Sequence, residues 1–153
     1  MADEIATTGR LAEVEDLLIR WLDEQLEDNP VVIAVEREPG ERRWFVRLQG
    51  EEKGVFSLWL TIGQRTLSFE TYVLPAPEEN HAAFYEHVLR RNRTFNGMAF
   101  AIWLEDAIYL IGQLPLGAVD EGELDRILGE TWVYVERCFR PAMRIGFASR
   151  FKG

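Results

Sequence analysis

The stretch VFSLWLTIGQRTLSFETYV, residues 55–73, decides the fold. Its two halves, 55–62 and 66–73, are rich in β-branched and aromatic residues and alternate in polarity, which is typical of strands that bury one face. Gly63-Gln64 lies between the halves, and glycine in the first place of a two-residue loop favours a type II′ hairpin turn. We therefore predict an antiparallel hairpin, which the neighbouring segments extend into a sheet.

The segment before this hairpin predicts a helix. Apolar side chains recur at spacings of three and four over residues 9–27, which indicates an amphipathic helix. Thr7 or Thr8 can cap it, because a hydroxyl accepts hydrogen bonds from the unpaired N–H groups of the first turn. Asp28-Asn29-Pro30 ends it, since proline restricts the residue before it. Residues 1–7 are expected to form a loose N-terminus.

Two strands are predicted on each side of the central hairpin. Residues 31–36 and 44–49 are β-rich runs around a Pro39-Gly40 turn. Residues 97–104 and 107–114 indicate a second hairpin. Each pair is joined by a short connection, so antiparallel pairing is expected throughout.

Two more helices complete the pattern. Residues 78–92 predict the first, whose inner stripe is expected to hold His81, Tyr85, Val88, Leu89 and Asn92. His87 is expected to point the other way, into solvent. The last helix begins near Asp120. Pro141 is expected to kink or split this helix, because proline lacks an N–H and clashes with the preceding turn.

The predicted order is therefore α-β-β-β-β-α-β-β-α in a single domain over residues 8–150. This order, with short loops, predicts an α+β fold, a twisted antiparallel sheet with three helices on one face. The chain has 153 residues, which is the size of one domain.

The strand positions that face away from the helices are not purely polar. Serine, glutamate and glutamine alternate there with five large aromatic residues, namely Phe45, Trp59, Tyr72, Trp103 and Tyr109. Aromatic side chains bury much area at little entropic cost, so such a face suits contact with a partner or a second copy. The alternative is that a helix or loop of the same chain covers it.

Charge and cysteine content narrow the partners and the compartment. The net charge is −9, so neither nucleic acid nor an anionic membrane surface is an expected partner. Cys138 is the single cysteine and cannot form an intramolecular disulfide. The start is acidic, unlike a signal peptide, and no uncharged apolar stretch is long enough to span a bilayer. We expect a cytoplasmic protein.

Catalytic signatures are missing from the sequence. It has no phosphate-binding loop, no H-E-x-x-H, no zinc-ligand spacing and no G-x-S-x-G. His81 and His87 are six residues apart on one helix, so they cannot share a metal. Arg137 and Arg140 would lower the pKa of Cys138, but its place on an apolar stripe favours an inert packing residue. We predict no catalytic, cofactor-binding or metal-binding residue, and hence no enzyme.

Three arginines, Arg90, Arg91 and Arg93, close the second predicted helix. Cations there are favoured by the negative end of the helix dipole. The functional alternative is an anion contact for an acidic peptide or a phosphate, which arginine binds bidentately. In that case His81 would line the same pocket.

Several stretches resemble one bacterial family. WLTIGQRTLSFETYVLPAPEENHAAFYEHVLRRN (59–92), AFAIWLEDAIYLIGQLPL (99–116), ELDRILGETWVYVERCF (123–139) and GFAS (146–149) are similar to the actinobacterial branch of the YbjN family. That family is described as one of sensory-transduction regulators. The resemblance implies a fold like that of type III secretion chaperones, which are often dimeric and bind extended segments of other proteins. It supplies no catalytic residue.

The expected function is thus a non-enzymatic protein-binding module, chaperone-like or regulatory, which forms a homodimer and binds an unidentified protein. Two alternatives stay open. One is a small-molecule sensor or unfamiliar enzyme that uses the region of Arg90, Arg91, Arg93 and His81. The other is a homodimer closed by the aromatic face.

Overall fold

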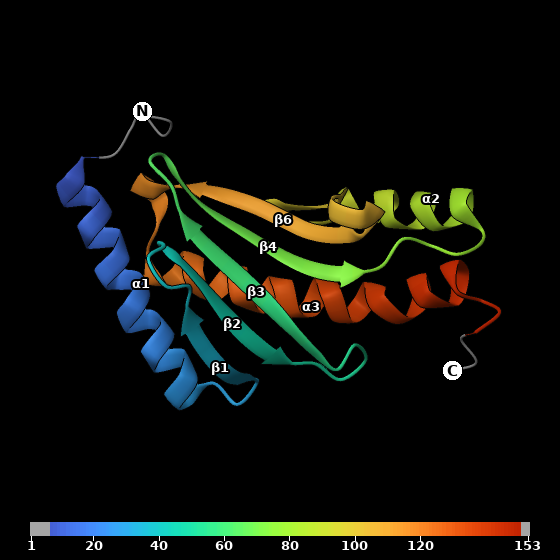
Figure 1. The fold of residues 1–153 in the computed structure, drawn as a ribbon, viewed down its shortest axis with the longest axis horizontal. Coiled ribbons are helices and arrows are strands. Elements are labelled where there is room, and N and C mark those ends of the chain that lie inside the picture. Colours follow the sequence, from blue (N-terminus) through green and yellow to red (C-terminus); the bar gives the residue numbers. More distant parts are fainter. Residues whose placement is uncertain (1–6, 151–153) are drawn as a thin grey trace.

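A computed structural model describes residues 7–150 and shows three α-helices, six β-strands and two short 3₁₀ turns in that range (Figure 1). The elements are, in order, α1 (Thr8–Asp28), β1 (Val32–Arg37), β2 (Arg43–Gln49), β3 (Val55–Ile62), β4 (Thr66–Leu74), α2 (His81–Asn92), β5 (Met98–Ile102), β6 (Ile108–Pro115) and α3 (Glu121–Gly146), with 3₁₀ turns at Leu104–Asp106 and Leu116–Ala118. The predicted α+β class and element order are confirmed. Residues 1–6 of the predicted loose N-terminus lie outside the described residues.

The six strands form one antiparallel sheet in the order β1-β2-β3-β4-β6-β5. β3 and β4 pair only over Trp59–Ile62 and Leu67–Glu70, although both strands are longer. Beyond Trp59 the two strands diverge, as Figure 1 shows. The sheet therefore opens on one side into two halves, β1-β2-β3 and β4-β6-β5.

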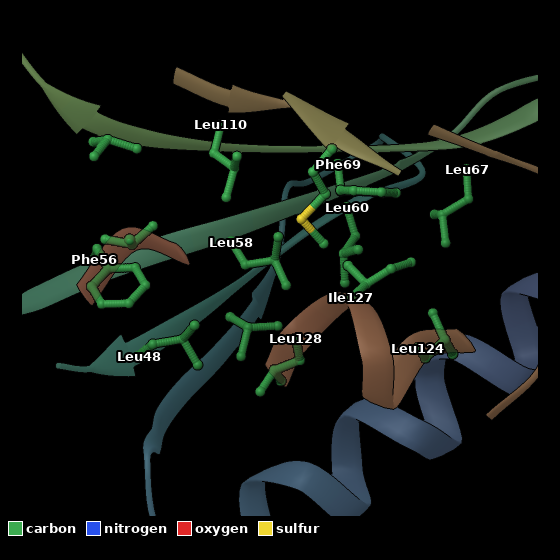
Figure 2. Close-up of a cluster of buried hydrophobic side chains, with 14 of the residues drawn as sticks. Leu48, Phe56, Leu58, Leu60, Leu67, Phe69, Leu110, Leu124, Ile127 and Leu128 are labelled. Atoms are coloured by element: carbon green, nitrogen blue, oxygen red, sulfur yellow. The ribbon is translucent and has the colours of Figure 1, made fainter. Parts of the chain in front are cut away.

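The core lies between the sheet and α3. Alternate strand residues point to this side, and Figure 2 shows Leu58, Leu60 and Leu110 facing Ile127 and Leu128 of the helix. These side chains are at most 4% exposed. Full burial of an aliphatic side chain contributes about 1.5–3 kcal/mol, so this layer is the main source of stability.

The first helix has the predicted cap and buries the predicted apolar stripe. The Thr7 hydroxyl accepts from the N–H of Arg10 at 3.1 Å, which confirms the threonine cap. Val14 and Leu18 are fully buried in the core. The indole N–H of Trp21 donates to Asp125 at 2.9 Å and ties α1 to α3.

The predicted turn between β3 and β4 is wrong in type. A type II′ turn needs a positive φ, and none of residues 63–66 has one. Instead, the N–H of Gly63 donates to the carbonyl of Thr66 at 2.9 Å. Gly63 and Thr66 are therefore the last hydrogen-bonded pair of the hairpin, and Gln64-Arg65 form its two-residue loop. The glycine is thus one place earlier in the hairpin than the predicted turn requires.

The two later helices also differ from expectation. α2 begins at His81 and not at residue 78, because Asn80 has a left-handed backbone conformation, with φ 53° and ψ 42°, which a right-handed helix cannot include. α3 runs through Pro141 as one helix. The hydrogen bond that proline cannot make would go to the carbonyl of Arg137, an exposed residue of the helix.

Candidate functional site

Four of the five predicted aromatic residues lie on one face of the sheet, the face turned away from α3. Phe45 is paired with Trp59 across β2 and β3, with ring centroids 5.0 Å apart. Tyr72 is paired with Tyr109 across β4 and β6, at 5.5 Å and edge to face. We call Phe45, Trp59, Tyr72 and Tyr109 the outer aromatic face. Trp103 lies beyond the end of β5, at the turn to β6, and is 60% exposed.

Cationic side chains of β2 and of the loop after it lie over these rings. Arg43 is 4.3 Å from the Trp59 ring, and Lys53 is 5.4 Å from that of Tyr72. Such contacts contribute about 0.5–1 kcal/mol at exposed sites. They cover the rings only in part, since Tyr72 remains 42% exposed and Trp59 is half-buried. The outer aromatic face is therefore available for contact.

A concavity of about 870 Å³ adjoins the outer aromatic face. It is lined by Arg43, Thr61, Ser68, Phe69, Glu70, Gly97, Met98, Ala99, Ile111, Gly112 and Gln113. Within this lining, the Arg43 guanidinium donates to the Thr61 hydroxyl at 2.9 Å and to the Glu70 carboxylate at 3.0 Å. Glu70, which lines the concavity, is the ladder partner of Trp59, and Arg43, which also lines it, lies over the Trp59 ring. Its lining combines hydrogen-bonding side chains with an apolar floor.

The loop between β2 and β3 is fastened to α3 at the open side of the sheet. The carboxylate of Glu136, 8% exposed, accepts from the backbone N–H groups of Glu51 at 2.8 Å and Glu52 at 2.6 Å. Lys53 of this loop has its ammonium 4.9 Å from the Phe139 ring. Burial lowers the pKa of Lys53, and the charge of Glu136 opposes that shift. This loop places Lys53 over Tyr72.

The sequence did not reveal this fastening, because Glu136 is more than eighty residues from the loop. The local sequence carries one sign of this contact, the glycine at position 50, where a Cβ atom would lie 1.8 Å from a Glu136 carboxylate oxygen. Only glycine leaves room for the carboxylate there. A glycine pair flanking E-E-K indicates a tight loop, but it does not indicate a partner on α3.

The histidines are placed in the reverse of the predicted arrangement. His81, expected on the inner stripe, is exposed, because α2 begins there and its inward side chains are Phe84 and Val88. Leu89, also expected inside, is 65% exposed. His87, expected in solvent, is half-buried with its Nε2 atom enclosed. Burial and the nearby Arg91 lower the pKa of His87.

The three arginines at the end of α2 do not form one site. Arg90 forms an ion pair with Glu86 at 3.1 Å. Arg93 is an exposed residue at the end of the helix. Arg91 lines a second cavity of about 360 Å³ between α2 and α3, together with Thr94, Phe95, Tyr134, Arg137 and Cys138. His81 does not line this cavity.

The thiol of Cys138 forms part of the wall of this second cavity. Its side chain is 3% exposed, and burial raises its pKa to about 11. Arg91 and Arg137 act in the opposite direction, but burial dominates. A neighbouring arginine thus does not make this thiol reactive at neutral pH.

Between residues 7 and 150 there is no group of three or more histidine, cysteine, aspartate or glutamate side chains placed to hold a metal ion. None of the helices in this range combines the length and the apolar character needed to cross a membrane.

Comparison with known proteins now defines the class. Residues 16–142 match the model of the YbjN family, described as "Putative bacterial sensory transduction regulator", and the chain belongs to this family. The resemblance noted in the sequence is thereby confirmed.

Proteins similar to this chain include mycobacterial ones that carry the name "Uncharacterized protein". Those of Mycobacterium tuberculosis and Mycobacterium bovis are 38% identical over 104 residues, which is 68% of this chain and 57% of theirs. One of Mycobacterium leprae is 34% identical over 110 residues, 72% of this chain and 60% of its own. The chain thus spans less than two thirds of the length of these relatives.

Proposed function

We propose that this chain is a non-enzymatic regulatory module that binds an extended segment of a partner protein at the outer aromatic face. The observation that carries the proposal is the set of partly exposed rings beside the 870 Å³ concavity. Exposed aromatic residues next to a hydrogen-bonding cleft are typical of the centre of protein interfaces.

The chemistry of the concavity favours a polypeptide over other ligands. Ser68, Gln113 and Thr61 offer donors and acceptors to peptide groups, and Ile111 offers an apolar contact. Arg43 and Glu70 neutralise each other, so no strong charge selects a phosphate backbone or a charged lipid. The protein's net charge of −9 agrees with this choice.

Two further considerations support the proposal. The family description, a sensory transduction regulator, agrees with a module that acts by binding. Resemblance to type III secretion chaperones points to partners held in extended form, although a shared fold does not by itself establish function. A single, buried cysteine suits a reducing compartment such as the cytoplasm.

The test is selection of random peptides displayed on phage against the purified chain. Selected peptides are then titrated against Trp59→Ser combined with Tyr109→Ser. Leu89→Ser is the matched control, because Leu89 is an exposed apolar residue on α2, outside the outer aromatic face. The proposal requires binding to be lost in the double variant and kept in the control. Failure to select any peptide, or equal binding to both variants, would contradict it.

Light scattering separates this reading from a homodimer closed by the same face. A dimeric wild type that becomes monomeric on Trp59→Ser would assign the outer aromatic face to a second copy of the chain. A mass that is unchanged by Trp59→Ser leaves that face to another protein.

A further inference from the structure

The second cavity, between α2 and α3, concentrates positive charge in an acidic protein. At least eight arginines between residues 7 and 150 form ion pairs with carboxylates. Arg91 and Arg137 form none with the described residues, and both line this cavity. None of its six lining residues is acidic. The wall of the cavity therefore holds two arginines and no carboxylate to neutralise them.

Two stacked aromatic residues, Phe95 and Tyr134, form another part of the wall. The Tyr134 hydroxyl accepts from the backbone N–H of Asn96 at 3.1 Å, so its own proton remains available to donate. The ring of Phe95 stacks on that of Tyr134 with centroids 4.0 Å apart and planes 15° apart, which fixes the hydroxyl in place. The side of the cavity next to Phe95 is apolar.

The thiol at this cavity does not oppose an anion. Because burial raises the pKa of Cys138 to about 11, the group is neutral at physiological pH. Arg91 and Arg137 both line the same cavity as this neutral thiol. His87 lies next to Arg91, with Nδ1 3.3 Å from an Arg91 nitrogen, and it adds no negative charge either.

We propose that this cavity binds a small phosphate monoester, whose phosphate oxygens contact Arg91 and Arg137 and whose organic part rests on Phe95. A monoester carries a charge of about −1.5 to −2 at neutral pH, which matches two arginines, whereas one carboxylate matches one. Arginine binds phosphate oxygens through paired N–H groups. The volume of about 360 Å³ is that of a small-ligand pocket.

Binding here would bridge α2 and α3 and does not depend on the outer aromatic face. Arg91 comes from the last turn of α2, Thr94 and Phe95 from the segment after it, and Arg137 from α3. The hydrogen bonds between these elements lie at the other end of α2, where Asn80 donates to the carbonyl of Ile145 at 2.9 Å, so a bound phosphate would add a polar link at the end near Arg91. A ligand could therefore bind here independently of a partner at the outer aromatic face.

The experiment is titration of the ¹⁵N-labelled chain with phenyl phosphate, inorganic phosphate and benzoate, followed by NMR and calorimetry. Phenyl phosphate is expected to shift the amides of residues 94, 95, 134 and 137 and to bind more tightly than either of the others. Arg91→Gln and Arg137→Gln should each weaken it about tenfold or more. Arg93→Gln is the matched control, since Arg93 lies at the same helix end outside the cavity, and its effect should stay within about twofold.

Three results would overturn the proposal. The first is the absence of saturable shifts with millimolar phenyl phosphate. The second is an equal loss in the Arg93 control, which would indicate diffuse charge attraction. The third is inorganic phosphate binding as tightly as phenyl phosphate, which would leave a site for the free ion only.

Discussion

Glu136→Gln is expected to lower the free energy of unfolding by about 2–3 kcal/mol, because it loosens the loop between β2 and β3. The buried carboxylate accepts from the N–H groups of Glu51 and Glu52 at 2.8 and 2.6 Å. A hydrogen bond to a charged group contributes about 1.5–3 kcal/mol. Glutamine is neutral and keeps one oxygen acceptor, so one charged bond becomes a neutral one. Its amino group faces the second N–H, which is left unpaired.

Urea unfolding at neutral pH, followed by tryptophan fluorescence, measures this loss as a shift of the midpoint at constant slope. Glu130→Gln is the matched control on the same helix. Glu130 pairs with Arg126, which keeps a second partner in Glu123, and surface pairs of this kind contribute about 0–1 kcal/mol. If Glu136→Gln costs no more than Glu130→Gln, the carboxylate does not fasten the loop and the argument fails.

Three further predictions concern other parts of the chain. Gly129→Ala should raise the free energy of unfolding by about 0.5–1 kcal/mol, because Gly129 is inside α3 and an added Cβ meets nothing within 4 Å. The urea midpoint should rise accordingly, and a lowered midpoint would contradict this. Cys138 should resist iodoacetamide in the native state, since its thiol is buried with a pKa of about 11, and rapid labelling seen by mass spectrometry would show otherwise. His87 has a pKa lowered from 6.5 in the folded protein, so the unfolded state binds more protons and stability falls as pH decreases through about 6.5. His87→Asn should flatten that fall, whereas His81→Asn should not, and equal slopes in wild type and both variants would refute the assignment.

Much of the candidate site follows from strand alternation. Phe45 and Trp59 share the parity of polar residues in their strands, so their common face is predictable once the strands pair in register. Trp103 shares that parity too, but β5 ends at Ile102 and the chain turns away before it. Alternation along a strand predicts the face on which a side chain lies only for residues inside that strand.

The arginine site shows the opposite case. Arg91 is conspicuous in the sequence because Arg90 and Arg93 surround it, yet only Arg91 of the three lines a cavity. Its companion there, Arg137, is forty-six positions away on α3. Which helix-end arginine faces inward depends on the angle at which α2 and α3 pack, and no local pattern contains that angle.

The sequence by itself determined the order of helices and strands, the apolar face of the strands and of α1, and the antiparallel connections. These properties arise from hydrogen bonding and periodicity within short windows of the chain. Only the tertiary structure decided where β3 and β4 part, that Glu136 meets the loop after β2, and that His87 rather than His81 is enclosed. Those outcomes depend on the twist of the sheet and on contacts between segments far apart in the chain. Both are set jointly by many packed residues and not by any short stretch of sequence.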